Sequence, residues 1–168
     1  MYEFRPSRTN NKAQKLIVLF FVGAAALFLL SVPLEGLPFL WVIQLFAILL
    51  LVAAVFLVTR YMTKAFEYSI SEGDLTVTEI SGGGKRRIAV CRVSLSGIES
   101  ARVIEGKDEG LRAIRRARKR IFDYRPDISP HKSILAVARE GGEEFLILFA
   151  YDEEFLSILR GSVDERNI

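Results

Sequence analysis

A long interval without charge dominates the N-terminal part of the chain. Between Lys15 and Arg60 the only ionisable residue is Glu35, and the other residues form two apolar runs, Leu16–Val32 and Leu37–Val58, around a short turn. Because bilayer hydrocarbon is about 30 Å thick, a helix needs about 20 apolar residues to cross it. The interval therefore predicts a transmembrane helical hairpin, with helices over about 16–32 and 37–58.

Two other interpretations of the apolar runs are weaker. A hairpin in a soluble core is disfavoured, because soluble helices are seldom apolar on every side over such lengths. A cleaved signal peptide fits the first run, which follows several cations. However, the first run leads directly into a second one, and no convincing small-x-small cleavage site precedes the turn.

Small residues near the middle of both runs favour close packing of the two helices. The first run contains Gly23, Ala24, Ala25 and Ala26, and Ala47 lies at a comparable depth in the second. Small side chains let helix backbones approach each other in lipid. We therefore expect the helices to meet at these positions.

The charges that flank the hairpin predict its orientation. Cations precede the first run, Arg60 and Lys64 follow the second, and the turn carries no Lys or Arg. The positive-inside rule then places both termini in the cytoplasm and only the turn outside, as in a multi-pass plasma-membrane protein. Cys91, the only cysteine, would be a reduced thiol there.

The distribution of charge argues against nucleic acid as a partner. The net charge is +3, but residues 1–64 hold six Lys/Arg and two acids, whereas residues 65–168 hold 17 Lys/Arg and 18 acids. A nucleic-acid-binding domain needs a basic footprint on its folded surface. The excess positive charge flanks the hairpin instead.

Residues 65–168 are predicted to form one small domain of strands followed by a helix. Apolar and polar residues alternate along Ala65–Ser71, and Gly141-Gly142 is a strong hairpin signal. Asp152 suits the N-cap of a terminal amphipathic helix. The other expected strands are Leu75–Thr78, Arg87–Leu95, Ile98–Ile104, Ser133–Arg139 and Glu143–Ala150.

Short motifs link the chain to a known family. They are Phe66–Ile70 with Gly73-Asp74-Leu75, Lys85-Arg86-Arg87 leading a strand, and Phe149–Glu154 entering the last helix. With these motifs the chain resembles an uncharacterised family of small bacterial membrane proteins, in which two transmembrane helices precede a bacterial pleckstrin-homology-like domain.

The resemblance implies a fold, a location and a domain order, but no activity. We expect a basic cytosolic arm over 1–15, the transmembrane hairpin over 16–59 and a cytosolic α+β domain over 65–168. The domain would be an antiparallel PH-like sheet or partial barrel with a C-terminal amphipathic helix. The first hairpin turn, Glu72-Gly73-Asp74, is acidic, whereas phosphoinositide-binding relatives are usually basic there.

A basic segment over Leu111–Phe122 is the main candidate binding site. In a helix its cations would share one arc opposite Leu111, Ile114 and Phe122, a pattern typical of contact with anionic lipid headgroups or a protein partner. Its apolar face could equally pack on the domain's own sheet, and its cations could pair with the acidic residues 139–166. The candidate residues are Arg112, Arg115, Arg116, Arg118, Lys119 and Arg120, together with the loop residues Lys85, Arg86 and Arg87.

Catalytic, metal and cofactor signatures are absent from the sequence. His131 is expected to be solvated in a loop, and Cys91 is expected to pack as a small buried residue. Gly82-Gly83-Gly84-Lys85 lacks the spacing of a phosphate-binding loop and precedes a strand. We therefore expect a protein that is not an enzyme and holds no cofactor or metal.

The leading functional hypothesis is a membrane-anchored binding or adaptor module that presents a PH-like domain at the cytoplasmic face. Its partners would be the lipid bilayer, anionic headgroups, or a membrane or cytosolic protein. The alternative is an accessory subunit of a larger membrane complex, docked through the hairpin, with Gln44 as a polar residue within a helix.

Overall fold

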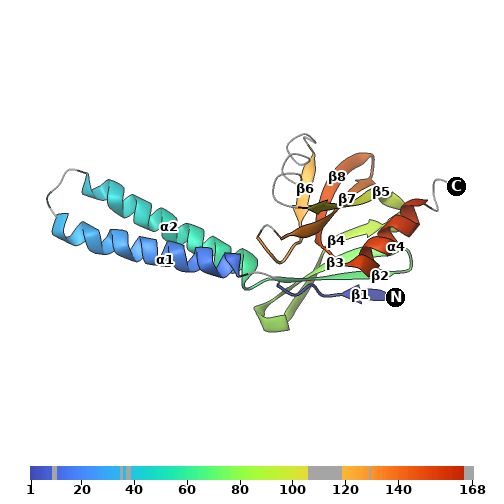
Figure 1. Ribbon diagram of the computed structural model, residues 1–168, viewed down its shortest axis with the longest axis horizontal. Coiled ribbons are helices and arrows are strands. Elements are labelled where there is room, and N and C mark those ends of the chain that lie inside the picture. Colours follow the sequence, from blue (N-terminus) through green and yellow to red (C-terminus); the bar gives the residue numbers. More distant parts are fainter. Residues whose placement is uncertain (9–10, 35, 37–38, 106–118, 129, 165–168) are drawn as a thin grey trace. The chain divides into compact units, whose positions relative to one another are not determined.

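The computed structural model describes residues 1–8, 11–34, 36, 39–105, 119–128 and 130–164 (Figure 1). The chain divides into two compact units. Asn10–Thr63 forms the helical unit, and Met1–Thr9 together with Lys64–Ile168 forms the sheet unit. The sheet unit is thus assembled from residues on both sides of the apolar interval.

The helical unit is a pair of helices packed through small residues. Helix α1 spans Lys12–Ser31, a short 3₁₀ turn follows, and α2 spans Leu40–Tyr61. The side chains of Ala24, Ala47 and Ala54 are almost fully buried. A Cβ atom on Gly23 would lie 3.4 Å from Leu50 Cδ1, so this is a close approach. The predicted packing is confirmed at Gly23, Ala24 and Ala47, whereas Ala25 and Ala26 are exposed.

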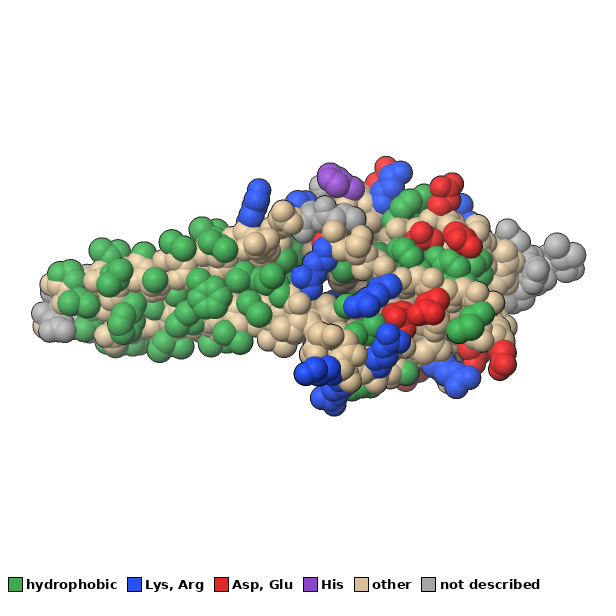
Figure 2. Space-filling model, turned by 90° about the horizontal axis from the view of Figure 1, so that it is seen from below, with side chains coloured by type: hydrophobic (Ala, Val, Ile, Leu, Met, Phe, Trp, Pro, Cys, Tyr) green, Lys and Arg blue, Asp and Glu red, His purple; other side chains and the backbone are tan. Residues whose placement is uncertain are grey.

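Large apolar side chains cover the outer surface of this helix pair. Trp41, Phe46 and Phe56 are each more than half exposed, and apolar side chains run along the helices in the view of Figure 2. Both helices are long and apolar enough to cross a membrane by length and composition. Soluble helices usually bury such side chains, so this surface suits lipid.

The first sheet of the sheet unit has four antiparallel strands in the order β1-β2-β3-β4. Tyr2–Phe4 forms β1, and the other strands are β2 (Ala65–Ser71), β3 (Asp74–Ser81) and β4 (Arg86–Ser94). The predicted strand over Ala65–Ser71 is confirmed. Glu72 and Gly73 both have positive φ, at 54° and 85°, as a two-residue turn with the twist of its strands requires.

Strand β1 was not expected, because the sequence predicts a cytosolic arm over residues 1–15. Tyr2 lies opposite Ile70 and Phe4 opposite Tyr68, so this short strand extends the first sheet beyond β2. Three residues are too few to show a clear alternation of apolar and polar side chains. The strand forms because its two aromatic side chains pack against the core of the domain.

The second sheet has the order β5-β7-β8-β6. Its strands are β5 (Ile98–Glu105), β6 (Arg120–Asp123), β7 (Lys132–Glu140) and β8 (Glu143–Ala150). Strands β5, β7 and β8 pair antiparallel, β6 runs parallel to β8, and Gly141 and Gly142 form the predicted hairpin turn.

The helix predicted over Leu111–Phe122 is wrong at its C-terminal end. Arg120, Ile121 and Phe122 lie in β6, opposite Phe145, Leu146 and Ile147 of β8. Pairing with β8 satisfies backbone groups that the amphipathic pattern assigned to a helix. Residues 111–118 lie outside the described part of the chain.

Helix α4 (Glu153–Asp164) packs on the sheets and completes the core (Figure 1). The backbone N–H of Phe155 donates to Asp152 Oδ1 at 2.8 Å, which confirms the predicted N-cap. The rings of Tyr68, Phe149 and Phe155 are fully buried against one another, with centroids 5.1–5.4 Å apart. Tyr68 Oη also donates to the carbonyl of Tyr124 at 2.9 Å, so the core links both sheets.

Candidate functional site

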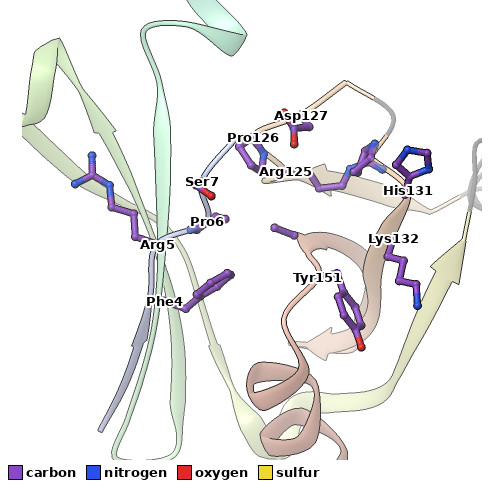
Figure 3. Close-up of a pocket in the computed structure, with 12 residues that line it drawn as sticks. Phe4, Arg5, Pro6, Ser7, Arg125, Pro126, Asp127, His131, Lys132 and Tyr151 are labelled. Atoms are coloured by element: carbon purple, nitrogen blue, oxygen red, sulfur yellow. The ribbon is translucent and has the colours of Figure 1, made fainter. Parts of the chain in front are cut away.

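A cavity of about 450 Å³ opens in the sheet unit where segments far apart in sequence meet (Figure 3). We call it the Tyr151 pocket. Residues after β1 form one wall, the connection from β6 to β7 forms another, and the end of β8 closes it. The lining residues are Phe4, Arg5, Pro6, Ser7, Arg125, Pro126, Asp127, Pro130, His131, Lys132, Ala150 and Tyr151.

Apolar atoms form most of the inner surface of this pocket. The rings of Phe4 and Tyr151 lie on opposite sides of the hollow, whereas the side chain of Arg5 extends away from it (Figure 3). Pro6 and Pro126 are buried. Proline fixes the backbone φ angle, so these segments hold the walls in place. The sequence gives no signal for this pocket, because its walls come from the expected N-terminal arm and from irregular loops.

Carboxylates already bind two of the cations that line the pocket. Arg125 contacts both carboxylate oxygens of Asp123, at 2.9 Å and 2.7 Å. Lys132 lies 3.1 Å from Glu105, which raises the pKa of the Lys132 ammonium group. A phosphate group bound at Arg125 or Lys132 would compete with these carboxylates for the same donors. The pocket therefore suits an apolar group better than a phosphorylated headgroup.

The volume of the pocket is compatible with such a ligand. Binding sites for small molecules are commonly about 300–1,000 Å³ and mostly apolar, with a few polar groups that fix orientation. Exposed His131 lies in a bend at the rim, as the sequence predicted for a solvated loop residue.

Of the six predicted cations of the basic segment, four cannot be placed and two are paired. Arg112, Arg115, Arg116 and Arg118 lie outside the described residues. Lys119 contacts Glu144, and Arg120 Nη1 lies 3.6 Å from Glu143 Oε2. The bond from Lys119 holds the pKa of the Glu144 carboxyl below its usual range. Lys119 and Arg120 therefore pair with acidic residues of the segment 139–166, which was one of the alternatives for the basic segment.

Of the predicted loop residues, Lys85 lies between β3 and β4, whereas Arg86 and Arg87 are the first two residues of β4. Arg87 Nη1 is 3.4 Å from Glu67 Oε1, whereas the side chains of Lys85 and Arg86 are exposed. At the acidic first hairpin, Asp74 pairs with Arg92 at 2.7 Å. These two ion pairs lie toward opposite ends of β3, which runs from Asp74 to Ser81.

A second hollow of about 370 Å³, the β4–β6 groove, runs between the last strands of the two sheets. Cys91 lines this groove and is only half-buried, although it was expected to be a buried core residue. Partial burial raises the pKa of the Cys91 thiol. The groove is lined by Val90, Cys91, Arg92, Arg120, Phe122, Tyr124, Glu140, Gly141, Glu143 and Phe145.

Comparison with known proteins gives a family and no individual relative. No curated protein and no solved structure matches the chain. A family model described as a bacterial PH-like domain, DUF6106, matches residues 5–166, a region that includes both apolar helices and strands β2 to β8 but not β1. This protein therefore belongs to the bacterial PH-like domain family DUF6106.

Proposed function

We propose that this protein is a non-enzymatic, membrane-anchored adaptor that presents its PH-like domain at the cytoplasmic face of the bacterial plasma membrane. The observation that carries the proposal is the pairing of β1 with β2. Strand β1 precedes the first apolar helix and β2 follows the second. Two strands can pair only on the same side of a membrane, so a chain that crosses it twice satisfies this pairing and a chain that crosses it once does not.

The charges next to the helices support a cytoplasmic position for the sheet unit. Arg5, Arg8, Lys12 and Lys15 lie before or at the start of α1, and Arg60 and Lys64 lie at or after the end of α2. Cytoplasmic flanks of membrane helices carry an excess of such residues. The turn between the helices carries only Glu35.

The Tyr151 pocket supports a protein partner over an anionic headgroup. Most of its inner surface is apolar, and Arg125 and Lys132 are held by Asp123 and Glu105. A partner's apolar side chain would fill the pocket without breaking either pair.

Cysteine labelling in intact cells tests the membrane topology. In a Cys91→Ala background, Glu35→Cys places a thiol in the turn and Lys85→Cys places one at the exposed end of β4. A membrane-impermeant maleimide should label the turn variant in intact cells and the Lys85 variant only after the membrane is permeabilised. Labelling of both or neither variant in intact cells, or extraction of the protein by alkaline carbonate, contradicts the proposal.

One observation favours a second function, that of an accessory subunit docked through the helices. The side chain of Gln44 is exposed on α2 rather than turned toward α1. An amide that faces lipid gains a hydrogen bond when a neighbouring membrane helix covers it. Gln44→Leu should then lose a membrane protein that co-purifies stoichiometrically in mild detergent, whereas Ile48→Leu should keep it. If no such protein co-purifies with the unmodified chain, the subunit role is excluded.

A further inference from the structure

One wall of the Tyr151 pocket comes from β1 and the residues directly after it. Residues 4–7 line the pocket, and Phe4 is also the last residue of β1. Phe4 pairs with Tyr68 of β2, and the centroids of their rings lie 6.0 Å apart. The pocket is therefore complete only while β1 is paired with β2.

The shape of the pocket suits a flat ring. In Figure 3 the rings of Phe4 and Tyr151 lie on opposite sides of the hollow. Lys132 Nζ lies 5.5 Å from the centroid of the Tyr151 ring, on the side away from Phe4, so the side toward the hollow is left for a ligand (Figure 3). Aromatic rings attract one another beyond the effect of the area that they bury. A ring between Phe4 and Tyr151 would therefore bind better than an aliphatic group of similar size.

The charged groups of the lining favour a ligand that donates a hydrogen bond. Asp127 lines the pocket and is only 5% exposed, whereas Arg125 and Lys132 already bind carboxylates. A carboxylate accepts hydrogen bonds at about four positions and cannot donate, so Asp127 can accept one from a ligand besides those from its own chain. A cation would lose its hydration between the apolar walls. The matching group is therefore a neutral N–H or O–H.

Two kinds of protein side chain combine a flat ring with such a donor. Tryptophan carries an indole N–H, and tyrosine carries a phenolic O–H. Both are enriched among the residues that anchor one protein in a pocket of another. The cavity of about 450 Å³ lies within the usual range for sites that hold a group of this size.

We propose that the Tyr151 pocket binds a tryptophan or tyrosine side chain of a partner protein, and that this binding fastens β1 to β2. The assignment rests on the proposed function as a binding module and specifies the residue that its partner contributes. A ligand that binds only the complete pocket stabilises the paired state of β1. The partner then also restrains the residues that lead from β1 into α1.

The direct test measures competition for the full chain in nanodiscs of neutral lipid. The probe is a short Gly/Ser peptide with a central fluorotryptophan, observed by fluorine NMR and compared with nanodiscs that hold no protein. Peptides with tryptophan or tyrosine at the central position should displace the probe. A leucine peptide, and a tryptophan peptide whose indole nitrogen is methylated, should each compete at least about five-fold more weakly, because one lacks the ring and the other lacks the donor.

Two variants and a matched control locate the site. Tyr151→Leu removes one ring of the pocket and should weaken binding of the probe several-fold. Phe122→Leu removes a ring of similar exposure on β6, outside the pocket, and should leave binding unchanged. Asp127→Ala should abolish the difference between the tryptophan peptide and its methylated form, which a general loss of stability would not do. Circular dichroism on each variant checks that the fold is retained.

Hydrogen exchange tests the link between the pocket and β1. At a concentration of the tryptophan peptide about ten times its Kd, exchange in a fragment that covers residues 1–8 should slow about ten-fold, because β1 then opens only after the peptide has left. Exchange in the β3–β4 turn, residues 82–85, should be unchanged, since this turn does not line the pocket.

Four outcomes would overturn the inference. They are equal competition by the leucine and tryptophan peptides, equal loss of binding in Tyr151→Leu and Phe122→Leu, exchange in residues 1–8 that does not respond to the peptide, and tighter binding of free indole than of the tryptophan peptide. The last result would show that the occupant is a small molecule. A correctly oriented chain that binds no aromatic peptide would refute this inference alone, whereas a wrong topology would refute the proposed function.

Discussion

Tyr2 donates a hydrogen bond from its hydroxyl to Asp152 Oδ1 at 2.7 Å, and the same oxygen accepts the backbone N–H of Phe155 at 2.8 Å. The Tyr2 ring also stacks on Phe155, with centroids 5.9 Å apart. The second residue of the chain thus supports the N-cap of its last described helix.

Loss of this contact should destabilise the sheet unit. Tyr2→Phe keeps the ring and removes the hydroxyl, which should lower the free energy of unfolding by about 1 kcal/mol. Asp152→Ala also removes the cap and should cost about 1–2 kcal/mol. Urea unfolding of the full chain in detergent, followed by circular dichroism, measures both effects. The double variant should be less destabilised than the two single effects combined, because the variants remove one shared interaction.

The matched control for these variants is Tyr151→Phe. Tyr151 is an exposed tyrosine whose ring faces Lys132. Its substitution should leave the unfolding curve unchanged. Equal effects of Tyr2→Phe and Tyr151→Phe would mean that the bond between Tyr2 and Asp152 contributes nothing.

Stability should fall in alkali. Burial raises the pKa values of Tyr2 and Tyr124, and Asp152 adds to the effect at Tyr2. Tyrosines in the unfolded chain ionise near pH 10, so this contribution is complete below about pH 10 and is lost as the pH rises further. Tyr2→Phe and Tyr124→Phe should each flatten the decline in unfolding free energy above that pH. An unchanged slope in both variants would contradict the raised pKa values.

Alanine substitutions at two glycines should change the stability of the protein in opposite directions. A Cβ atom on Gly97 would lie 2.9 Å from the backbone oxygen of Arg139, so Gly97→Ala must displace β7. We expect a loss of about 1–3 kcal/mol. Gly161 lies in α4 with open space around it, and Gly161→Ala should stabilise the protein by up to about 1 kcal/mol. Thermal unfolding of the two variants tests the pair, and equal shifts would contradict the packing at Gly97.

Cys91 should react slowly with alkylating reagents at neutral pH. Its pKa is raised by burial, so the reactive thiolate is scarce in the folded protein. The rate of alkylation should rise at a higher pH in the folded chain than in the same chain unfolded in urea. Identical pH profiles would show that burial does not control this thiol. Because the chain has one cysteine, the unmodified protein serves for the measurement.

A larger side chain at a buried position between α1 and α2 should destabilise their packing. Ala54 is fully buried in the helical unit, whereas Val52 is 61% exposed. Ala54→Leu should destabilise the helix pair by about 1–3 kcal/mol through overpacking, and Val52→Leu should have little effect. Fluorescence of Trp41, the only tryptophan, during denaturation in detergent reports the difference. Equal denaturation curves for Ala54→Leu and Val52→Leu would contradict close packing at Ala54.

Sequence patterns predicted the elements whose periodicity is strong. Alternation along Ala65–Ser71 predicted β2 with its observed bounds, and the Gly141-Gly142 signal predicted the β7–β8 turn. The tail helix was clear from its cap and its apolar arc. In each case local chemistry and tertiary packing favour the same structure.

Sequence patterns failed where tertiary pairing decides the structure. Arg120, Ile121 and Phe122 continue a helical pattern, but the edge of β8 holds them in a strand. Tyr2–Phe4 gives no local signal, and its partner strand lies beyond the whole apolar interval. The Tyr151 pocket was missed for the same reason, since Phe4 and Tyr151 meet only in the folded chain.

The place of β1 in the chain has a consequence for biosynthesis. It is synthesised before both apolar helices, but its partner β2 is synthesised only after them. In a chain whose helices cross the bilayer, the sheet unit can be completed only when the hairpin has been inserted with both ends on one side. Folding of the domain then acts as a check on insertion, because a misinserted chain leaves the aromatic side chains of Tyr2 and Phe4 separated from their core by the membrane.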